Sequence, residues 1–330
     1  MIYLNHDRIR ISEVANEWYL KLSTFLTDTR LCYAEYTDPD SGNRRMKRCD
    51  SYKAKMLEKV KLSSSDTDGI SLGTEYVNKF CDGLREMVLA EEEKLKSLHE
   101  EYQTVFIDNP TEQKAKVHRV LKDIFEDLYT DFTNKNAYYF FRKLNIRTCP
   151  YCNRNYTFTV REEDKHTRPE FDHFYDKSKN PLLAVSFYNL VPSCHTCNHT
   201  KGVDELRVNP YFHGFEGQFK IAEDGTFLGY DTRSEDEKHD MQKLALNGLY
   251  KEHDDYVQEL FAKAQAYNEH AREALVNSFQ GAGESPSEVF EFVWGKNLET
   301  ARQINRPLSK LTRDVLQQVG VIPKEDEEIV

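Results

Sequence analysis

Apolar residues recur at helical spacing in three stretches of the first half of the chain. The first runs from Glu13 to Leu26 and the second from Leu84 to Val105. The third begins at Val117 and leads into four consecutive aromatic residues, 138–141. Because residues three and four apart share one face of a helix, each stretch predicts an amphipathic helix on a core. We therefore expect residues 1–148 to form a helical N-terminal region.

The second half mixes strand and helix signals. Polar residues alternate with Tyr156, Phe158 and Val160, which is typical of a short strand or hairpin arm. Further on, Asp224-Gly225 lies between alternating apolar residues and predicts a β-hairpin. Helical spacing returns over 249–261 and again in RPLSKLTRDVLQQVG. Residues 203–330 are therefore expected to form a hairpin followed by helices, in a mostly α-helical α+β chain.

Composition places this chain among cytoplasmic globular proteins. It has 330 residues, of which 39% are hydrophobic, so it can bury a substantial core. No apolar run approaches the roughly 20 residues that cross a bilayer, so no membrane association is expected. The first residues, MIYLNHDRIRIS, lack the apolar segment of a signal peptide.

The net charge of −11 argues against general affinity for polyanions. The charge is unevenly distributed, because residues 149–201 contain seven basic and six acidic residues. The segment RRMKRCDSYKAKMLEKVK, residues 44–61, contains eight basic and two acidic residues. It could bind phosphates, or it could be the solvated face of a helix. The candidates for phosphate contact are Arg44, Arg45, Lys47 and Arg48.

Two CxxC pairs are the most specific signal in the chain. The first is Cys149 and Cys152 in CPYC, and the second is Cys194 and Cys197. Two such pairs supply four thiolates on tight turns, which is the ligand set of a tetrahedral structural zinc. A redox dithiol is the alternative for CPYC. It would require a strand-to-helix turn and would leave the second pair unexplained.

Three further motifs lie between and within these pairs: FDHFYDKS, NLVPSC and CNHTKG. With the cysteines they make residues 149–202 resemble an HNH endonuclease of the zinc-stabilised ββα-metal (His-Me finger) class. The amino-acid sequence of these motifs is similar, more narrowly, to that of PtuB-like HNH subunits of Septu-type anti-phage defence systems. The resemblance implies a central ββα-metal core over 149–202, a DNA substrate and an ATPase partner.

Phosphodiester hydrolysis requires a base that deprotonates water near neutral pH. His173 suits this role, because imidazole titrates close to neutrality. By resemblance, Asp172 and Asn198 are ligands of a catalytic divalent cation, and their hard oxygens favour Mg²⁺ or Mn²⁺. The resemblance also implies that Asn189 fixes the loop that orients the histidine.

Two lysines are candidates for phosphate contacts, Lys177 and Lys201. For Lys201 a solvated position on a helix is the equal alternative. The expected function is a metal-dependent endonuclease that acts as the effector of an anti-phage system. A non-catalytic zinc module that binds nucleic acid or protein is the main alternative, and a thiol oxidoreductase using CPYC is a third.

Overall fold

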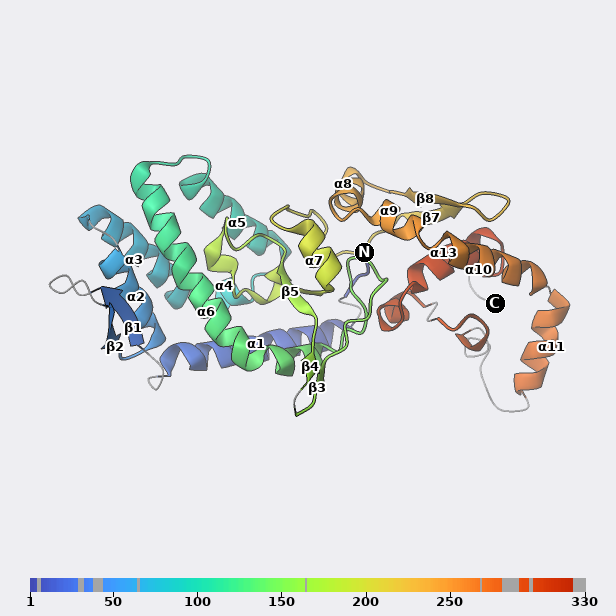
Figure 1. The fold of residues 1–330 in the computed structure, drawn as a ribbon, viewed down its shortest axis with the longest axis horizontal. Coiled ribbons are helices and arrows are strands. Elements are labelled where there is room, and N and C mark those ends of the chain that lie inside the picture. Colours follow the sequence, from blue (N-terminus) through green and yellow to red (C-terminus); the bar gives the residue numbers. More distant parts are fainter. Residues whose placement is uncertain are drawn as a thin grey trace. The chain divides into compact units, whose positions relative to one another are not determined.

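A computed structural model describes residues 1–4, 7–28, 33–37, 44–63, 66–163, 165–267, 269–280, 291–296 and 299–322 (Figure 1). The described chain is mostly helical and carries small two-stranded sheets. It forms two compact units. Unit 1 consists of Met1–His6, Ile146–Glu170 and Pro192–Val330, and unit 2 consists of Asp7–Asn145 and Phe171–Val191. The expected division into 1–148, 149–202 and 203–330 stays a prediction.

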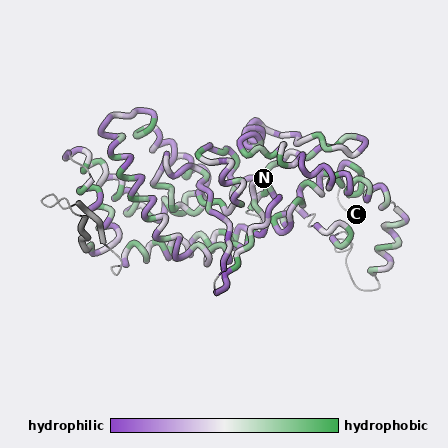
Figure 2. Tube along the Cα trace, viewed as in Figure 1, coloured by the Kyte–Doolittle hydropathy of each residue, from purple (hydrophilic) through white to green (hydrophobic). Residues whose placement is uncertain are grey.

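Unit 2 is built from helices and one hairpin. Its elements are α1 (Arg8–Thr27), β1 (Tyr33–Thr37), β2 (Arg44–Arg48), α2 (Tyr52–Ser63), α3 (Thr67–Asp82), α4 (Leu84–Val88), α5 (Glu92–Phe106), α6 (Glu112–Leu144), and the 3₁₀ turns η3 (Pro181–Leu183) and η4 (Phe187–Asn189). Hydrophilic and hydrophobic residues alternate along these helices (Figure 2). This is the pattern of helices that bury one face.

Trp18 on α1 lies at the centre of the unit 2 core. Its side chain is fully buried, and its ring contacts four phenylalanine rings at centroid distances between 4.7 and 6.2 Å: Phe132, Phe140, Phe171 and Phe187. The indole Nε1 donates a hydrogen bond to the Val185 carbonyl oxygen at 2.9 Å. This contact joins α1 to the loop between β5 and β6, which carries several predicted site residues.

The predicted helices of unit 2 are present, with two differences in detail. The stretch 84–105 is two helices, because Leu89 ends α4 and Glu91 is extended before α5 begins. Acidic residues in the first turn of α5 favour this new start through the helix dipole. The basic segment 44–61 is not one helix. Its first five residues form β2, which pairs antiparallel with β1, and its remainder leads into α2.

Unit 1 holds the shorter elements. They are β3 (Val160–Arg161), β4 (His166–Thr167), α7 (His195–Lys201), β7 (Gln218–Ile221), β8 (Phe227–Asp231), α8 (Glu235–Lys243), α9 (Leu246–Lys251), α10 (Asp254–Ala266), α11 (Glu269–Gln280), the 3₁₀ segment η5 (Thr300–Asn305) and α13 (Ser309–Gln318). The unit boundary passes through β5 (Glu170–His173) and β6 (Leu190–Ser193), which pair with each other.

The β7–β8 hairpin and the last helix are confirmed where the sequence predicts them. Gly225 in the hairpin turn has φ +86°, and a Cβ there would lie 2.7 Å from the Phe261 ring. Both facts require glycine at this position. Residues 249–261 are divided between α9 and α10 rather than forming one helix.

None of the helices in the described residues combines the length and the apolar character needed to span a bilayer.

The packing around Trp18 predicts the effect of removing its side chain. Trp18→Ala should lower the free energy of unfolding by about 3–5 kcal/mol, because it leaves a cavity and an unpaired carbonyl group. Urea titration followed by circular dichroism measures this change. Leu20→Ala, on the same helix at a position 60% exposed, is the control and should change the value by less than about 0.5 kcal/mol. Equal effects of the two variants would contradict the assignment of the core.

Candidate functional site

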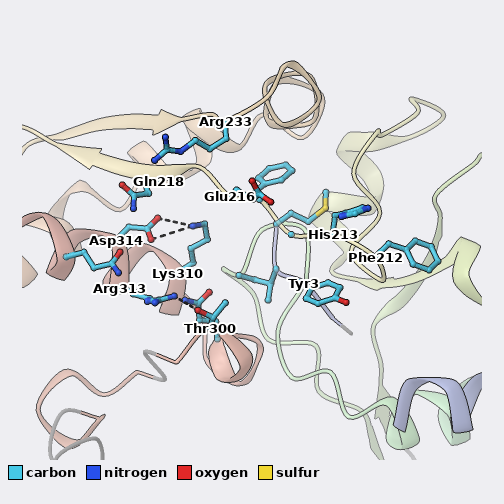
Figure 3. A pocket seen from close by; sticks show the side chains of 16 residues that line it. Tyr3, Phe212, His213, Glu216, Gln218, Arg233, Thr300, Lys310, Arg313 and Asp314 are labelled. Carbon is cyan, nitrogen blue, oxygen red and sulfur yellow. Dashed lines mark hydrogen bonds and ion pairs between the residues drawn. The ribbon is translucent and has the colours of Figure 1, made fainter. Parts of the chain in front are cut away.

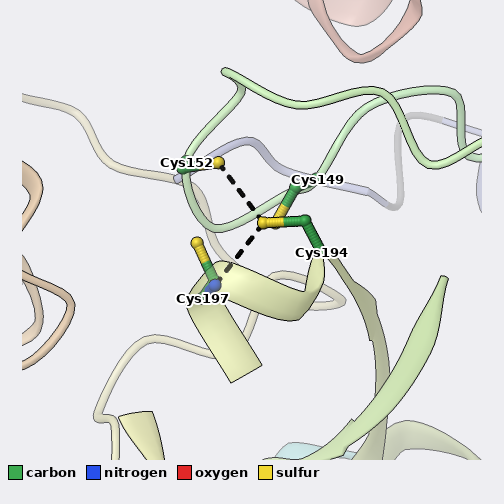
Figure 4. A group of neighbouring side chains, drawn as sticks. All are labelled: Cys149, Cys152, Cys194 and Cys197. Carbon is green, nitrogen blue, oxygen red and sulfur yellow. Dashed lines mark hydrogen bonds between the residues drawn. The ribbon is translucent and has the colours of Figure 1, made fainter. Parts of the chain in front are cut away.

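The two CxxC pairs meet in unit 1. Cys149 and Cys152 lie on a loop, and Cys194 and Cys197 lie at the start of α7 (Figure 4). The four sulfur atoms all lie within 4.8 Å of one another, and all four residues are buried. Among the described residues they form the one group of three or more His, Cys, Asp or Glu side chains arranged to hold a metal ion.

The geometry of the cluster fits a tetrahedral metal. Zinc–sulfur bonds of about 2.3 Å place the sulfurs of a tetrahedral site roughly 3.8 Å apart. The Sγ atoms of Cys152 and Cys194 are 4.0 Å apart. Backbone amides point at the sulfurs, since Arg154 N lies 3.4 Å from Cys152 Sγ and Cys197 N lies 3.5 Å from Cys194 Sγ. These four cysteines can therefore hold a metal ion such as zinc.

The close packing of the four thiols also changes their protonation. Burial raises the pKa of the Cys149 thiol well above its ordinary value. Hydrogen bonds from neighbouring thiols, that of Cys149 first, lower the pKa of Cys194. Without a cation the group therefore keeps some protons, whereas zinc binds the deprotonated thiolates. A redox dithiol needs a partly exposed sulfur, so the burial of all four residues disfavours that alternative.

Asn153 links the first cysteine turn to the segment before α13. It adopts the left-handed conformation with φ 47° and is almost fully buried. Its Nδ2 group donates to the carbonyl oxygens of Gln303 and Arg306 at 3.0 and 3.2 Å, and its own carbonyl accepts from Leu308 N at 2.6 Å. The turn that carries Cys149 and Cys152 is therefore fixed by the rest of unit 1.

His173 lies at the end of β5 in unit 2, where it is 9% exposed. Its Nε2 lies 3.0 Å from the Ala184 carbonyl oxygen. A carbonyl only accepts hydrogen bonds, so Nε2 carries the proton, and the neutral ring has its lone pair on Nδ1. The imidazole also packs edge-on against Tyr129 of α6, with ring centroids 4.7 Å apart. Asp172, its neighbour on β5, is 3% exposed.

Asn189 ties together the loop that follows His173. Its Oδ1 accepts from Tyr175 N at 2.8 Å. Its Nδ2 donates to the Tyr175 carbonyl oxygen at 3.1 Å and to the Leu183 carbonyl oxygen at 3.0 Å. Leu183 precedes Ala184, which accepts from His173. The Asn189 side chain thus holds both ends of the loop between the histidine and its acceptor.

Asn198 on α7 belongs to a polar cluster in unit 1. Its Nδ2 donates to Glu170 Oε2 at 2.7 Å, and His195 Nδ1 lies 3.0 Å from Glu170 Oε1. Burial raises the pKa of Glu170, but these two hydrogen bonds outweigh it and leave the pKa lowered. Because a carboxylate only accepts, the amide nitrogen faces Glu170 and the Asn198 Oδ1 atom points away from it. That oxygen is the atom a hard cation would bind.

Glu170 and His195 are not among the site residues predicted from the sequence. Glu170 is the hydrogen-bond acceptor that orients Asn198. The spacing of two residues between Glu170 and Asp172 is the feature of the sequence that could have identified Glu170 as a site residue. No spacing in the sequence connects Glu170 with His195, because they come from different elements.

The predicted phosphate-binding residues differ in their surroundings. Lys177 Nζ lies 4.9 Å from the centroid of the Tyr129 ring, the ring that His173 also contacts. Lys201 is 2% exposed, so the alternative of a solvated helix residue is wrong. The structure describes only the backbone of β2, and the side chains of Arg44, Arg45, Lys47 and Arg48 lie outside the described part. Their phosphate contacts stay predictions.

A polar cavity of about 770 Å³ lies in unit 1 (Figure 3). Two of its basic residues are bonded to groups of the same unit. Lys310 pairs with Asp314 at 3.1 Å and donates to the Gly217 carbonyl oxygen at 2.8 Å, and Arg313 donates to Thr300. None of the residues predicted for chemistry lines this cavity.

Comparison of the chain with protein-family models, curated proteins and solved structures finds no match.

The cysteine cluster predicts bound zinc and its role in stability. Elemental analysis should find about one zinc per chain, and Cys149→Ser should lower that content and the stability of the fold. Cys81→Ser is the control, because Cys81 lies outside the cluster and should leave the zinc content unchanged. Full zinc retention in Cys149→Ser would show that the cluster is not the metal site.

The hydrogen bonds of Asn189 predict the effect of an isosteric change. Asn189→Asp keeps the acceptor for Tyr175 N but places a carboxylate oxygen against two carbonyl oxygens. Unfolding experiments should show a loss of at least 1–3 kcal/mol, the typical cost of unpaired buried groups. Asn16→Asp on α1, where the side chain makes two exposed hydrogen bonds, to the Ser12 carbonyl oxygen and from the Arg85 guanidinium, should cost far less. A neutral Asn189→Asp variant would refute the role of this side chain in holding the loop.

Proposed function

We propose that this protein is a metal-dependent endonuclease that hydrolyses phosphodiester bonds of DNA. The proposal rests on the resemblance of residues 149–202 to HNH endonucleases and on the hydrogen bond of one histidine. The bond from His173 Nε2 to the Ala184 carbonyl places a proton on Nε2, so Nδ1 is the nitrogen that can accept a proton when the ring is neutral. A buried imidazole with this fixed tautomer is suited to accept a proton from water.

In the proposed reaction His173 Nδ1 removes a proton from a water molecule, and the water oxygen forms a bond to phosphorus. The bond from phosphorus to the 3′ oxygen breaks and the leaving oxygen takes a proton from solvent, which yields a 5′ phosphate and a 3′ hydroxyl end. Asp172 and Asn198 are proposed as oxygen ligands of Mg²⁺ or Mn²⁺, which when bound would stabilise charge on the leaving oxygen. The donor atoms fit this role, since one is a carboxylate and the other is the amide oxygen that faces away from Glu170.

Two side chains support the base without taking part in bond making, and a third is proposed to contact the substrate. Asn189 holds the loop that ends in the acceptor of the His173 proton. Tyr129 restricts the tilt of the imidazole by contact with its ring. Lys177, above the same tyrosine ring, is proposed to contact a substrate phosphate.

The proposal extends to the setting in which the nuclease acts. The similarity to PtuB-like subunits supports a role as the effector of an anti-phage system, with an ATPase as the partner that controls cutting. Co-expression with such an ATPase and measurement of phage protection would test this part. The phage-protection test is independent of the cleavage test, because cleavage of DNA can be measured with the purified protein alone.

The assigned base predicts the behaviour of a single substitution. His173→Ala should reduce the rate of supercoiled-plasmid cleavage by about 10²–10⁴-fold, because the general base is lost. The assay is run with Mg²⁺ or Mn²⁺, and zinc content and circular dichroism are measured on the same sample. Both should match the wild type, since His173 lies outside the cysteine cluster.

His270→Ala, at an exposed position on α11, serves as the control and should cleave at the wild-type rate. An active His173→Ala protein would falsify the assignment of the base. A folded, zinc-loaded wild type that cuts neither DNA nor RNA, with or without an ATPase partner, would favour the non-catalytic zinc module.

A further inference from the structure

A row of exposed apolar side chains follows the first cysteine turn in unit 1. Tyr156 is 48% exposed, Phe158 is 42% exposed and Val160 is 44% exposed. The intervening Thr157 is 4% exposed. The alternation shows an extended segment with one face in the core and the other in solvent. Large apolar side chains that gather on one exposed face usually mark a binding surface.

The two rings of this row are already arranged as a flat stack. The ring centroids of Tyr156 and Phe158 are 4.4 Å apart, and the ring planes differ by 20°. The Arg147 guanidinium lies 5.4 Å from the Phe158 centroid. We call Arg147, Tyr156, Phe158 and Val160 the aromatic row. Stacked rings beside a guanidinium group present the chemistry on which nucleobases stack.

The backbone under the aromatic row is held in place by the cysteine turn. Thr148 pairs with Tyr156 in an antiparallel bridge. Thr157 donates to the Arg147 carbonyl oxygen through its N–H at 2.9 Å and to the Ile146 carbonyl oxygen through its hydroxyl at 2.8 Å. The backbone that carries the rings is therefore ordered before a ligand binds, so binding loses less conformational entropy.

We propose that the aromatic row binds unpaired bases of single-stranded DNA. This inference rests on the proposed nuclease function and names the form of DNA that the chain holds. Unpaired bases would stack on the ring faces that the Tyr156–Phe158 pair leaves uncovered, as they do on other exposed aromatic side chains. Bases inside a duplex are covered on both faces by their neighbours, so the row discriminates against paired DNA.

The charges around the row favour a nucleic acid over an apolar protein partner. The exposed cation Arg147 lies beside the Phe158 ring, where it can meet a phosphate. The acidic residues Glu162 and Glu163 lie in the turn of the β3–β4 hairpin, together with the exposed cation Lys165. The turn lies beyond Val160, so the acids are displaced along the chain from the two rings. Three residues after β4, the chain enters β5, which carries Asp172 and His173.

The test is fluorescence anisotropy with a labelled single-stranded oligodeoxynucleotide. Full-length His173→Ala protein is used as the background, so that binding is measured without cleavage. Adding Tyr156→Ala or Phe158→Ala should weaken binding roughly 5- to 150-fold for each ring, the range expected for loss of one base stack. Tyr156→Phe and Phe158→Tyr retain a ring and should retain the affinity. Leu228→Ala, at an exposed apolar position of the same unit, is the matched control and should bind normally.

Salt dependence separates stacking from phosphate contact. The slope of log K against log salt should be unchanged in Tyr156→Ala, whereas Arg147→Ala should reduce it by about 0.7, the value for one phosphate on a single strand. A duplex of the same sequence should bind Tyr156→Ala and its parent equally.

Wild-type affinity in the Tyr156→Ala and Phe158→Ala variants would overturn the proposal, and so would equal losses for single-stranded and duplex DNA. Absence of single-strand binding in the parent would also overturn it. These outcomes do not depend on catalysis. If the rings bind single strands but no cleavage occurs, the nuclease assignment fails while the binding surface stands.

Discussion

Four sulfur atoms brought close together in buried positions form the constraint on which unit 1 depends. Thiolates that share a buried space repel one another, and a bound cation offsets this repulsion. Fixing the four sulfurs fixes the turn after Cys149, the start of α7 at Cys194 and, one helical turn later, the position of Asn198. It also fixes the backbone at residue 2, since Ile2 N donates to the Pro150 carbonyl oxygen at 2.7 Å. The cluster thereby sets the backbone positions of side chains that have no contact with the metal site.

In unit 2 a set of hydrogen bonds has a comparable effect on the His173 side chain. The acceptor of His173 Nε2 is a backbone carbonyl on a loop, and Asn189 binds that same loop at both ends. This backbone acceptor places a proton on Nε2. In the neutral ring Nδ1 is then the nitrogen that can accept a proton, as the proposed general-base chemistry requires.

The features that the sequence predicted are those encoded within a few residues. CxxC spacing identifies the four cysteines that can hold a metal ion, Asp224-Gly225 identifies the β7–β8 hairpin, and helical spacing identifies α1 and α6. The break at Leu89 to Glu91 was not predicted, because apolar spacing continues across it. The strand β2 was missed because RRMKR has no alternation of apolar and polar residues. The acceptor of His173 is a backbone carbonyl, and the contact between Glu170 and His195 joins separate elements, so neither could be found from residue types.

The net charge of −11 opposes the proposed binding of a polyanionic substrate, but charge acts over a limited range. At physiological ionic strength the screening length is about 8 Å, so acidic residues far from a binding surface repel phosphates weakly. Many of the acids are also paired locally, as in Lys59–Asp127 and Lys55–Asp131 on the helices of unit 2. A chain with this balance gains little from the release of counterions and needs a short-range attraction to hold a nucleic acid. Stacking on aromatic rings is such an attraction, because every base offers a flat face whatever the charge around it. The acidic composition is therefore compatible with the proposed binding of single-stranded DNA at the aromatic row.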